Sequence, residues 1–239
     1  MNNQRIWEAL ILGAFIGLGL IILGYFLASS VTRLKAQERT VTVKGLAEQE
    51  MPADIAIWPI RFTVADNDLS NLFAVIQGNN ALVIEFLKAN DFSAPEISIS
   101  VPAIVDRQAQ EYVDASKVQY RYSASSVITV YSEQVEKVRQ AMEKIVELVK
   151  QGIAIAGKDY QSTPQFLFTG LNDLKPAMVE KATKEAREVA EKFAKDSGSQ
   201  LGKIKRARQG QFEIKDRDSN TPYIKKIRIV STVEYYLSD

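Results

Sequence analysis

Hydrophobic positions change their spacing several times along the chain, and each change predicts a different kind of element. Residues 9–28 form the longest apolar run and contain no charged side chain. A helix of this length rises about 30 Å, which is the thickness of the hydrocarbon core of a bilayer. No second apolar run of comparable length follows in the sequence. The pattern therefore predicts a single N-terminal transmembrane helix.

A cleaved signal peptide is the alternative interpretation of this segment, because Ala28 and Ser30 are small residues suited to a cleavage site. Cleavable apolar regions usually extend over about 7–15 residues, so the greater length favours a retained signal anchor. We assign residues 1–30 to the anchor, 31–38 to a short polar tether and 39–239 to a soluble domain. The sequence leaves open whether this part forms one domain or two lobes.

Alternation of polar and apolar residues predicts the strands. In residues 55–65, the even positions from Ala56 to Val64 are apolar, and Pro59 places this strand at a sheet edge or at a bulge because proline has no amide hydrogen to donate. The same alternation predicts further strands over 40–50, 97–101, 118–131, around 166–168, 204–214 and 223–237.

Spacing of three and four residues predicts three helices, over 68–90, 132–151 and 174–197. The third has a narrow, alanine-rich apolar seam, with charged pairs on its other side. The seam is expected to consist of Leu174, Met178, Ala182, Ala186, Val189, Ala190 and Phe193. Strands followed by helices and then by further strands are typical of an α+β fold, with antiparallel sheets and helices packed on one face.

The composition narrows the possible chemistry. With 30 basic and 29 acidic residues, the net charge is +1, so no overall charge attracts nucleic acid. The chain has no cysteine and no histidine. This excludes disulfides, thiol nucleophiles, zinc sites built on these residues and imidazole-based triads. We therefore expect no catalytic residues, no cofactor and no metal, and the composition disfavours an enzyme.

Two acidic segments resemble calcium loops without matching them. In the first, which begins at Asp66, Asn71 stands where the turn glycine belongs and Gln77 where a bidentate glutamate belongs. The second begins at Asp216 and lacks the same two features, with Thr221 at the turn. A helix cap is expected for the first segment, and a polar hairpin loop for the second.

Other candidate sites are weak when taken singly. Glu48, Glu50 and Asp54 surround a turn, and the basic residues of 203–208 fit the exposed face of a strand. The spacing of Gly13 and Gly17 allows two apolar helices to approach closely. Aromatic side chains favour interfaces, and the candidate oligomer interface consists of Tyr120, Tyr122 and Tyr131.

Several local motifs occur in an order that resembles the SIMPL-domain family, which includes bacterial periplasmic immunogenic proteins. The first two are Val41-Thr-Val-Lys-Gly-Leu-Ala and Pro52-Ala-Asp54-Ile-Ala56, where Ala53 is an insertion relative to the family pattern. The strand that begins at Tyr122 and the closing Val230-Ser-Thr-Val-Glu-Tyr are also similar. The best match is the alanine-rich helix, glycine stop and Leu-Gly-Lys strand entry over 186–204.

This resemblance implies an α+β envelope protein that is commonly homo-oligomeric and loosely linked to stress tolerance, with no established catalytic residues. We expect a non-enzymatic structural or interaction module. It would be anchored in the bacterial inner membrane by a single pass through residues 9–28, with its C-terminal domain in the periplasm and a second copy as partner. The positive-inside rule, read literally, favours a cytoplasmic C-terminal domain. One basic side chain, Arg5, precedes the span, whereas Arg33, Lys35 and Arg39 follow it. Two alternatives stay open: a ring-forming channel or enclosure, and a carboxylate-dependent hydrolase or lyase with a cleft between lobes.

Overall fold

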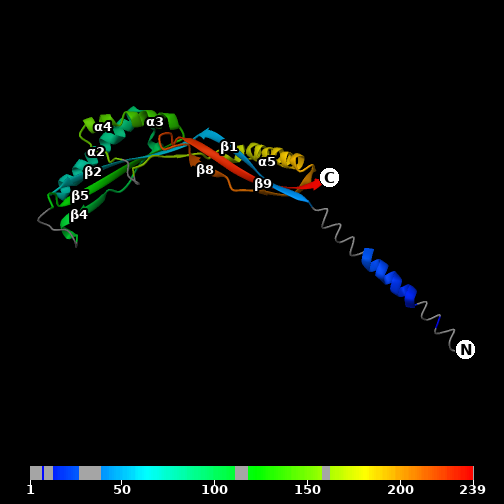
Figure 1. Cartoon of the computed structure of the whole chain (residues 1–239). Coiled ribbons are helices and arrows are strands. Elements are labelled where there is room, and N and C mark those ends of the chain that lie inside the picture. The colour runs from blue at the N-terminus through cyan, green and yellow to red at the C-terminus, as the bar shows by residue number, and fades with distance from the viewer. Residues whose placement is uncertain (1–6, 8–12, 27–38, 111–117, 158–161, 239) are drawn as a thin grey trace. The chain divides into compact units, whose positions relative to one another are not determined.

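Antiparallel pairing dominates the computed structural model, which describes residues 7, 13–26, 39–110, 118–157 and 162–238 (Figure 1). The expected α+β class with antiparallel sheets and helices is confirmed. The chain divides into two compact units that are interleaved in sequence. Unit 1 comprises Met1–Ala47, Ala177–Phe212 and Arg228–Asp239, and unit 2 comprises Glu48–Pro176 and Glu213–Ile227.

Unit 2 is built on a sheet with the strand order β3-β5-β2-β6. Its long strands, β2 (Ile55–Asp66) and β5 (Tyr122–Ser132), pair antiparallel from Ala56 opposite Ser132 to Asp66 opposite Tyr122. Three short strands complete it: β3 (Ile97–Ile99) and β4 (Ala103–Asp106) both pair with β5, and β6 (Gln165–Leu167) pairs with the first residues of β2. Short 3-10 helices occupy Ala94–Glu96 and Arg107–Ala109.

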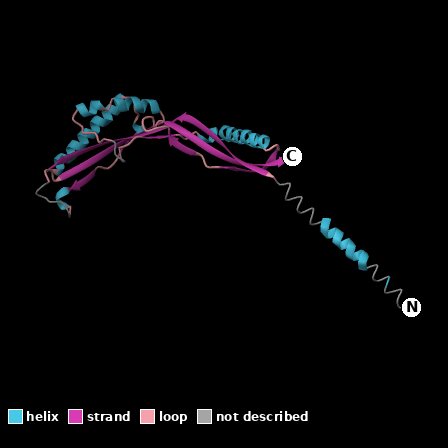
Figure 2. Cartoon of the chain, viewed as in Figure 1, coloured by secondary structure: helices cyan, strands magenta, loops and turns pink. Residues whose placement is uncertain are grey.

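One face of this sheet carries the main core. The apolar residues at even positions of β2 and β5 pack beneath α2 (Leu69–Ala89), α3 (Val135–Glu143) and α4 (Val146–Lys150). Figure 2 shows these helices on one side of the sheet. The largest buried side chains at this contact are Trp58, Ile60, Phe62, Phe86, Leu87, Ile128 and Leu148.

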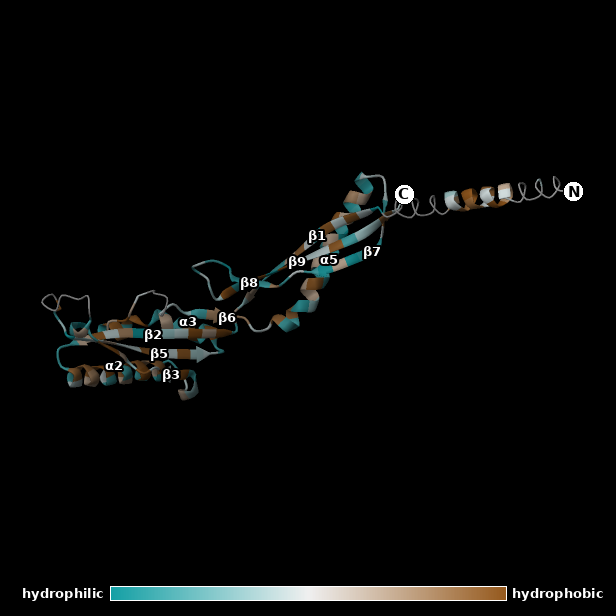
Figure 3. Cartoon of the chain, turned by 90° about the horizontal axis from the view of Figure 1, so that it is seen from below, coloured by the Kyte–Doolittle hydropathy of each residue, from teal (hydrophilic) through white to brown (hydrophobic). Residues whose placement is uncertain are grey.

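Unit 1 contains the greater part of a second antiparallel sheet, with the order β1-β9-β7. Its strands are β1 (Thr40–Pro52), β7 (Gln200–Gln209) and β9 (Ile224–Ser238), and β8 (Glu213–Asp216) also pairs with β9. Helix α5 (Leu171–Asp196) packs Ala186 and Ala190 against Val43, Val233 and Tyr235. Figure 3 shows the alternation of hydrophobic and hydrophilic residues along β1 and β9.

The backbones of helix α5 and strand β1 lie in close contact at Gly45. A Cβ atom added to Gly45 would lie 1.8 Å from the carbonyl oxygen of Ala182, 2.5 Å from the amide nitrogen of Ala186 and 2.9 Å from the Cβ of Ala186. Such separations are far below van der Waals contact, so only glycine fits at this position. The close contact between α5 and β1 therefore requires both the small residues of the helix and the glycine of the strand.

This close approach corrects part of the expected seam. Met178, Ala182, Ala186, Ala190 and Ala194 are buried, but Phe193 is 57% exposed. The buried residues repeat every four positions, and an aromatic ring finds no space where the backbones of helix and strand almost touch. The sequence pattern identified the helix correctly and misplaced one edge of its buried face.

Three further expectations need correction. The apolar spacing over 68–90 includes Leu69 and Phe73 and predicts both on the buried face of the first helix, but both are exposed. The helix predicted over 132–151 is divided into α3 and α4 by a turn at residues 144 and 145. The strand predicted over 204–214 is two strands, β7 and β8.

The N-terminal segment is helical over residues 13–26. Within the described residues, no helix is both long enough and apolar enough to cross a membrane. The predicted span of 9–28 includes residues 9–12 and 27–28, which lie outside the described part of the chain.

Candidate functional site

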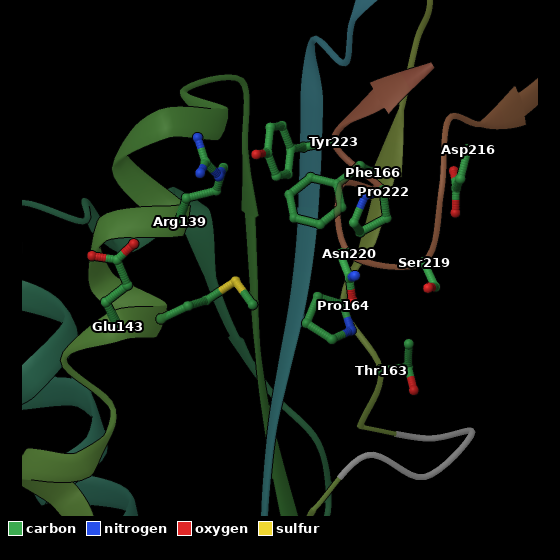
Figure 4. Close-up of a pocket in the computed structure, with 11 residues that line it drawn as sticks. Arg139, Glu143, Thr163, Pro164, Phe166, Asp216, Ser219, Asn220, Pro222 and Tyr223 are labelled. Atoms are coloured by element: carbon green, nitrogen blue, oxygen red, sulfur yellow. The ribbon is translucent and has the colours of Figure 1, made fainter. Parts of the chain in front are cut away.

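A pocket of about 640 Å³ opens on unit 2 between helix α3, the residues leading into β6, and the loop between β8 and β9 (Figure 4). Its apolar lining comes from Met142, Pro164, Phe166, Pro222 and Tyr223. Its polar lining comes from Arg139, Glu143, Thr163, Asp216, Ser219 and Asn220. An apolar surface with a few polar groups around it is the usual composition of a ligand site.

The β8–β9 loop owes its shape to Asp218. The carboxylate accepts hydrogen bonds from the amides of Asn220 and Thr221, both at 2.8 Å, from the Thr221 hydroxyl, and from Arg217 Nε at 3.2 Å. These bonds, with that of the Thr221 side chain the strongest, lower the pKa of Asp218 to about 2. The loop is thus the polar hairpin that the sequence predicted, and it brings Ser219 and Asn220 to the pocket.

Tyr223 connects the loop to the helical side of the pocket. The Arg139 guanidinium lies 3.7 Å from the centre of the Tyr223 ring, and Phe166 meets the same ring edge-on with 6.1 Å between centroids. Arg139 also donates to Glu136 at 2.6 Å. A cation over an aromatic face and an edge-to-face ring pair are both stabilising, so this wall is preformed.

Within the part of the lining that the structure describes, two carboxylates contribute negative charge to the pocket. Asp216 forms an ion pair with Lys225, whose side chain is 9% exposed, whereas Glu143 is exposed at the end of α3. Among the described lining residues, the cationic one is Arg139, which is paired with Glu136. This arrangement suits an uncharged polar ligand or a partner side chain.

The three acidic residues expected around a turn do not converge. Asp54 accepts from the amide and hydroxyl of Thr169 and from the amide of Gly170, at 2.7–3.1 Å, just before α5 begins. Glu48 pairs with Lys226 at 2.9 Å, and Glu50 lies 3.5 Å from Arg217. Each carboxylate therefore has a separate structural partner.

The acidic segment that begins at Asp66 is a helix cap, as the sequence predicted. Asp68 is the N-cap of α2 and accepts from the Asn71 amide at 2.7 Å. Asp66 accepts from the Asp68 amide at 2.9 Å and from the Asn71 side chain at 2.5 Å. These bonds, the first of them the strongest, lower the pKa of Asp66.

The structure separates the three tyrosines of the candidate oligomer interface. Tyr122 packs with Leu72 and Ile76 on the helix-covered face. Tyr131 differs from it in parity along β5, so it lies on the opposite face, where it is 49% exposed. Tyr120 precedes the strand and is 43% exposed. They do not form one surface, although Tyr131 faces outward.

The glycines of the predicted membrane-helix contact, Gly13 and Gly17, belong to the helical residues 13–26. A Cβ atom added at either glycine would meet no other atom within 4 Å. Their role in a contact between two membrane helices therefore stays a prediction.

Sequence reasoning missed a polar cluster centred on Glu96. This carboxylate accepts from Ser132 at 2.6 Å, from the Ser93 amide at 2.9 Å and from Lys137 at 3.1 Å, and Lys137 also lies 4.5 Å from the centre of the Phe92 ring. Burial raises the pKa of Glu96, but these hydrogen bonds outweigh it and lower the pKa to about 2. A glutamate three residues after Ser93 was the one available signal, as a capping box.

These features define the chain as an α+β protein of two antiparallel-sheet units, with a pocket in unit 2. It belongs to the SIMPL family, described as a protein of unknown function (DUF541), whose family model matches residues 41–233. The resemblance inferred from the ordered motifs is thereby confirmed. Comparison with curated proteins gives no significant match.

Proposed function

We propose that this SIMPL protein is a membrane-anchored, non-enzymatic interaction module of the bacterial cell envelope. In this proposal, residues 9–28 hold the chain in the inner membrane by a single pass. The soluble part stands in the periplasm, associates with further copies and contributes to stress tolerance. The apolar N-terminal segment supports the anchor, and the envelope location is what the resemblance to SIMPL proteins implies.

The observation that carries the anchor is the exposure of the apolar helix over residues 13–26. Phe15 is 69% exposed, Ile21 is 72% exposed and Phe26 is 64% exposed. Large apolar side chains on all sides of a helix need a nonpolar environment, which a bilayer supplies. The Gly13–Gly17 spacing adds a surface through which two such helices can associate.

A non-catalytic role is supported by the acidic groups. General acids need a raised pKa at neutral pH. The carboxyl groups of the described residues whose pKa is clearly shifted, namely Asp66, Glu96, Asp106 and Asp218, all have a lowered pKa. Hydrogen-bonded carboxylates of this kind hold loops and caps in place, which suits a rigid binding scaffold.

Fusion proteins test the topology. We expect alkaline phosphatase fused after Asp239 to be active, because the enzyme needs the periplasm to fold, and GFP at the same position to be dark. Carbonate extraction of membranes should leave the full chain in the pellet, whereas a variant with Ile16 and Ile21 both changed to Arg should be released. An active GFP fusion with an inactive phosphatase would place the domain in the cytoplasm and refute this proposal.

A further inference from the structure

Three polar side chains that line the pocket at Tyr223 are not used by the fold. The side chains of Glu143, Ser219 and Asn220 form no hydrogen bond or ion pair with the residues that the structure describes. Glu143 is the last residue of α3, whereas Ser219 and Asn220 belong to the β8–β9 loop, and Figure 4 shows Glu143 on the helix side and Ser219 on the loop side. The loop is held by Asp218 instead. These three side chains are therefore available to a ligand.

The uncompensated charge around the pocket is negative. Glu143 is exposed, and it also ends α3, where a helix carries partial negative charge. The side chain of Asp216 is paired with Lys225 but is still 51% exposed. The guanidinium of Arg139 donates to Glu136 at 2.6 Å, so its positive charge is compensated. A positively charged ligand group therefore suits this pocket better than an anion.

The apolar part of the lining favours an aliphatic stem. Its non-aromatic members are Met142, Pro164 and Pro222. The two rings offer little free surface, because Phe166 is 5% exposed and the guanidinium of Arg139 covers one face of Tyr223. A ligand guanidinium, which gains most from stacking on an aromatic face, finds that position occupied. A lysine side chain instead packs its four-carbon stem along apolar surface and keeps its ammonium group at the rim.

We propose that this pocket receives a lysine side chain of a partner polypeptide, with the stem against Met142 and the ammonium group at Glu143. This inference rests on the proposed function, because it gives the chemistry of a partner for the interaction module. Pockets of about 300–1,000 Å³ hold drug-sized ligands, so about 640 Å³ accommodates a lysine together with its neighbouring residues. The wall formed by Arg139, Tyr223 and Phe166 is preformed, so binding loses little free energy in ordering it.

A methionine methyl group reports binding at this pocket directly. The chain has 4 methionines, of which Met142 lines the pocket and Met178 is buried in unit 1. The full chain, with isotope-labelled methionine methyl groups, is purified in an uncharged detergent and titrated with acetyl-Ala-Lys-Ala-amide in an NMR experiment. The Met142 signal is identified as the one that Met142→Leu removes. We expect this signal to shift until it saturates, and the Met178 signal to stay in place.

Two comparisons test the role of the charge. The same peptide with norleucine in place of lysine keeps the stem without the ammonium group, and it should bind at least about tenfold more weakly. Glu143→Lys should weaken binding of the lysine peptide at least about tenfold, because it opposes two cations. Glu147→Lys is the matched control, since Glu147 is exposed on the neighbouring helix α4 and is not among the described lining residues. It should change the Kd by less than about twofold.

Other results overturn the inference. Equal affinity for the norleucine peptide would show an apolar pocket that does not recognise charge. Cadaverine that shifts the Met142 signal with an affinity equal to that of the lysine peptide would assign the site to a small free amine. A Met142 signal that shifts with N-acetylglucosamine and not with the peptide would assign it to an uncharged ligand.

The inference and the proposed function fail separately. Peptide binding is measured on the purified chain, so a Met142 signal that the lysine peptide leaves in place overturns the inference, and the anchor and topology of the proposed function stand. An inactive phosphatase fusion removes the periplasmic location, and the measured affinities of the pocket stay as they are.

Discussion

Replacing Gly45 with alanine is the most direct test of the contact between β1 and α5. The new Cβ would stand 1.8 Å from the Ala182 carbonyl oxygen. Ordinary contact between carbon and oxygen is about 3.4 Å, so helix and strand must separate by about 1.5 Å. The position of a Cβ atom is fixed by its own backbone, and the Ala182 oxygen is a backbone atom, so no change of rotamer can relieve the clash.

The expected cost follows from the packing that this separation removes. A gap of about 0.5–1 Å already forfeits a quarter to a half of a dispersion contact. The cluster of Val43, Ala186, Ala190, Val233 and Tyr235 would be opened by more than that. Forcing atoms into a filled core costs about 1–3 kcal/mol even when side chains adjust. We therefore expect Gly45→Ala to lower the free energy of unfolding by at least about 3 kcal/mol.

Urea unfolding followed by far-ultraviolet circular dichroism measures this change, and Gly78→Ala serves as the matched control. Gly78 is exposed within α2, and a Cβ atom there meets nothing within 4 Å. The same substitution should stabilise the protein by about 0.5–1 kcal/mol at this position, because alanine favours the helix. A Gly45→Ala variant that unfolds within 1 kcal/mol of the wild type would refute the reasoning.

A double variant identifies the clashing atom. In Gly45→Ala with Ala186→Gly, the contact at 2.9 Å with the Ala186 Cβ is removed, but the contact with the Ala182 oxygen stays. We expect no recovery of stability. Full recovery would mean that the side chain of Ala186, and not the backbone of α5, limits the approach.

Two further predictions concern single side chains. Glu96→Gln should destabilise the protein at pH 7 by about 1–2 kcal/mol. A carboxyl pKa lowered from 4.5 to about 2 is equivalent to about 3 kcal/mol of stability. We expect less than this value because the Glu96 side chain is 20% exposed and solvent partly screens its charge. Because the pKa of Glu96 is lowered in the folded state, this carboxylate stabilises the folded protein above pH 4.5, and the contribution disappears as the pH falls toward 2. The free energies of unfolding of wild type and variant, measured across that interval, should therefore converge. A difference that stays constant with pH would contradict the lowered pKa of Glu96. Phe193→Asp should change the free energy of unfolding by less than about 1 kcal/mol, because Phe193 is exposed. Ala190→Asp buries an unpaired carboxylate and should cost several kcal/mol. Similar melting temperatures for the two variants would contradict the orientation of α5.

Much of the fold could be predicted from local patterns. The alternation over 55–65 and 223–237 gave strands close to their observed bounds, because each has one face buried and one open. The apolar spacing over 68–90 gave α2, and Asp68 gave its cap. In these elements, burial follows directly from the period of the side chains.

Features that depend on distant residues could not be predicted in this way. The exposure of Phe193 follows from the contact of α5 with Gly45, which the sequence separates by well over a hundred residues. The Glu96 cluster joins Ser93, Ser132 and Lys137 from different elements. The pocket likewise combines α3 with a loop near the C-terminus. The local spacing of apolar residues carries no information about contacts between residues that are distant in the sequence.

The motifs that identify the family also indicate where function should be sought. Val41-Thr-Val-Lys-Gly-Leu-Ala and the alanine-rich helix meet in the contact at Gly45, so their residue types are explained by packing alone. Packing does not explain the outer face of β2 and β5, whose charged residue on these two strands is Arg61, since none of the described helices lies on it. Packing also does not explain the polar groups around the pocket at Tyr223. Residues that the fold does not require are those available for binding, and both sets lie in unit 2. Unit 2 is therefore the part of the chain in which partners and ligands should be sought.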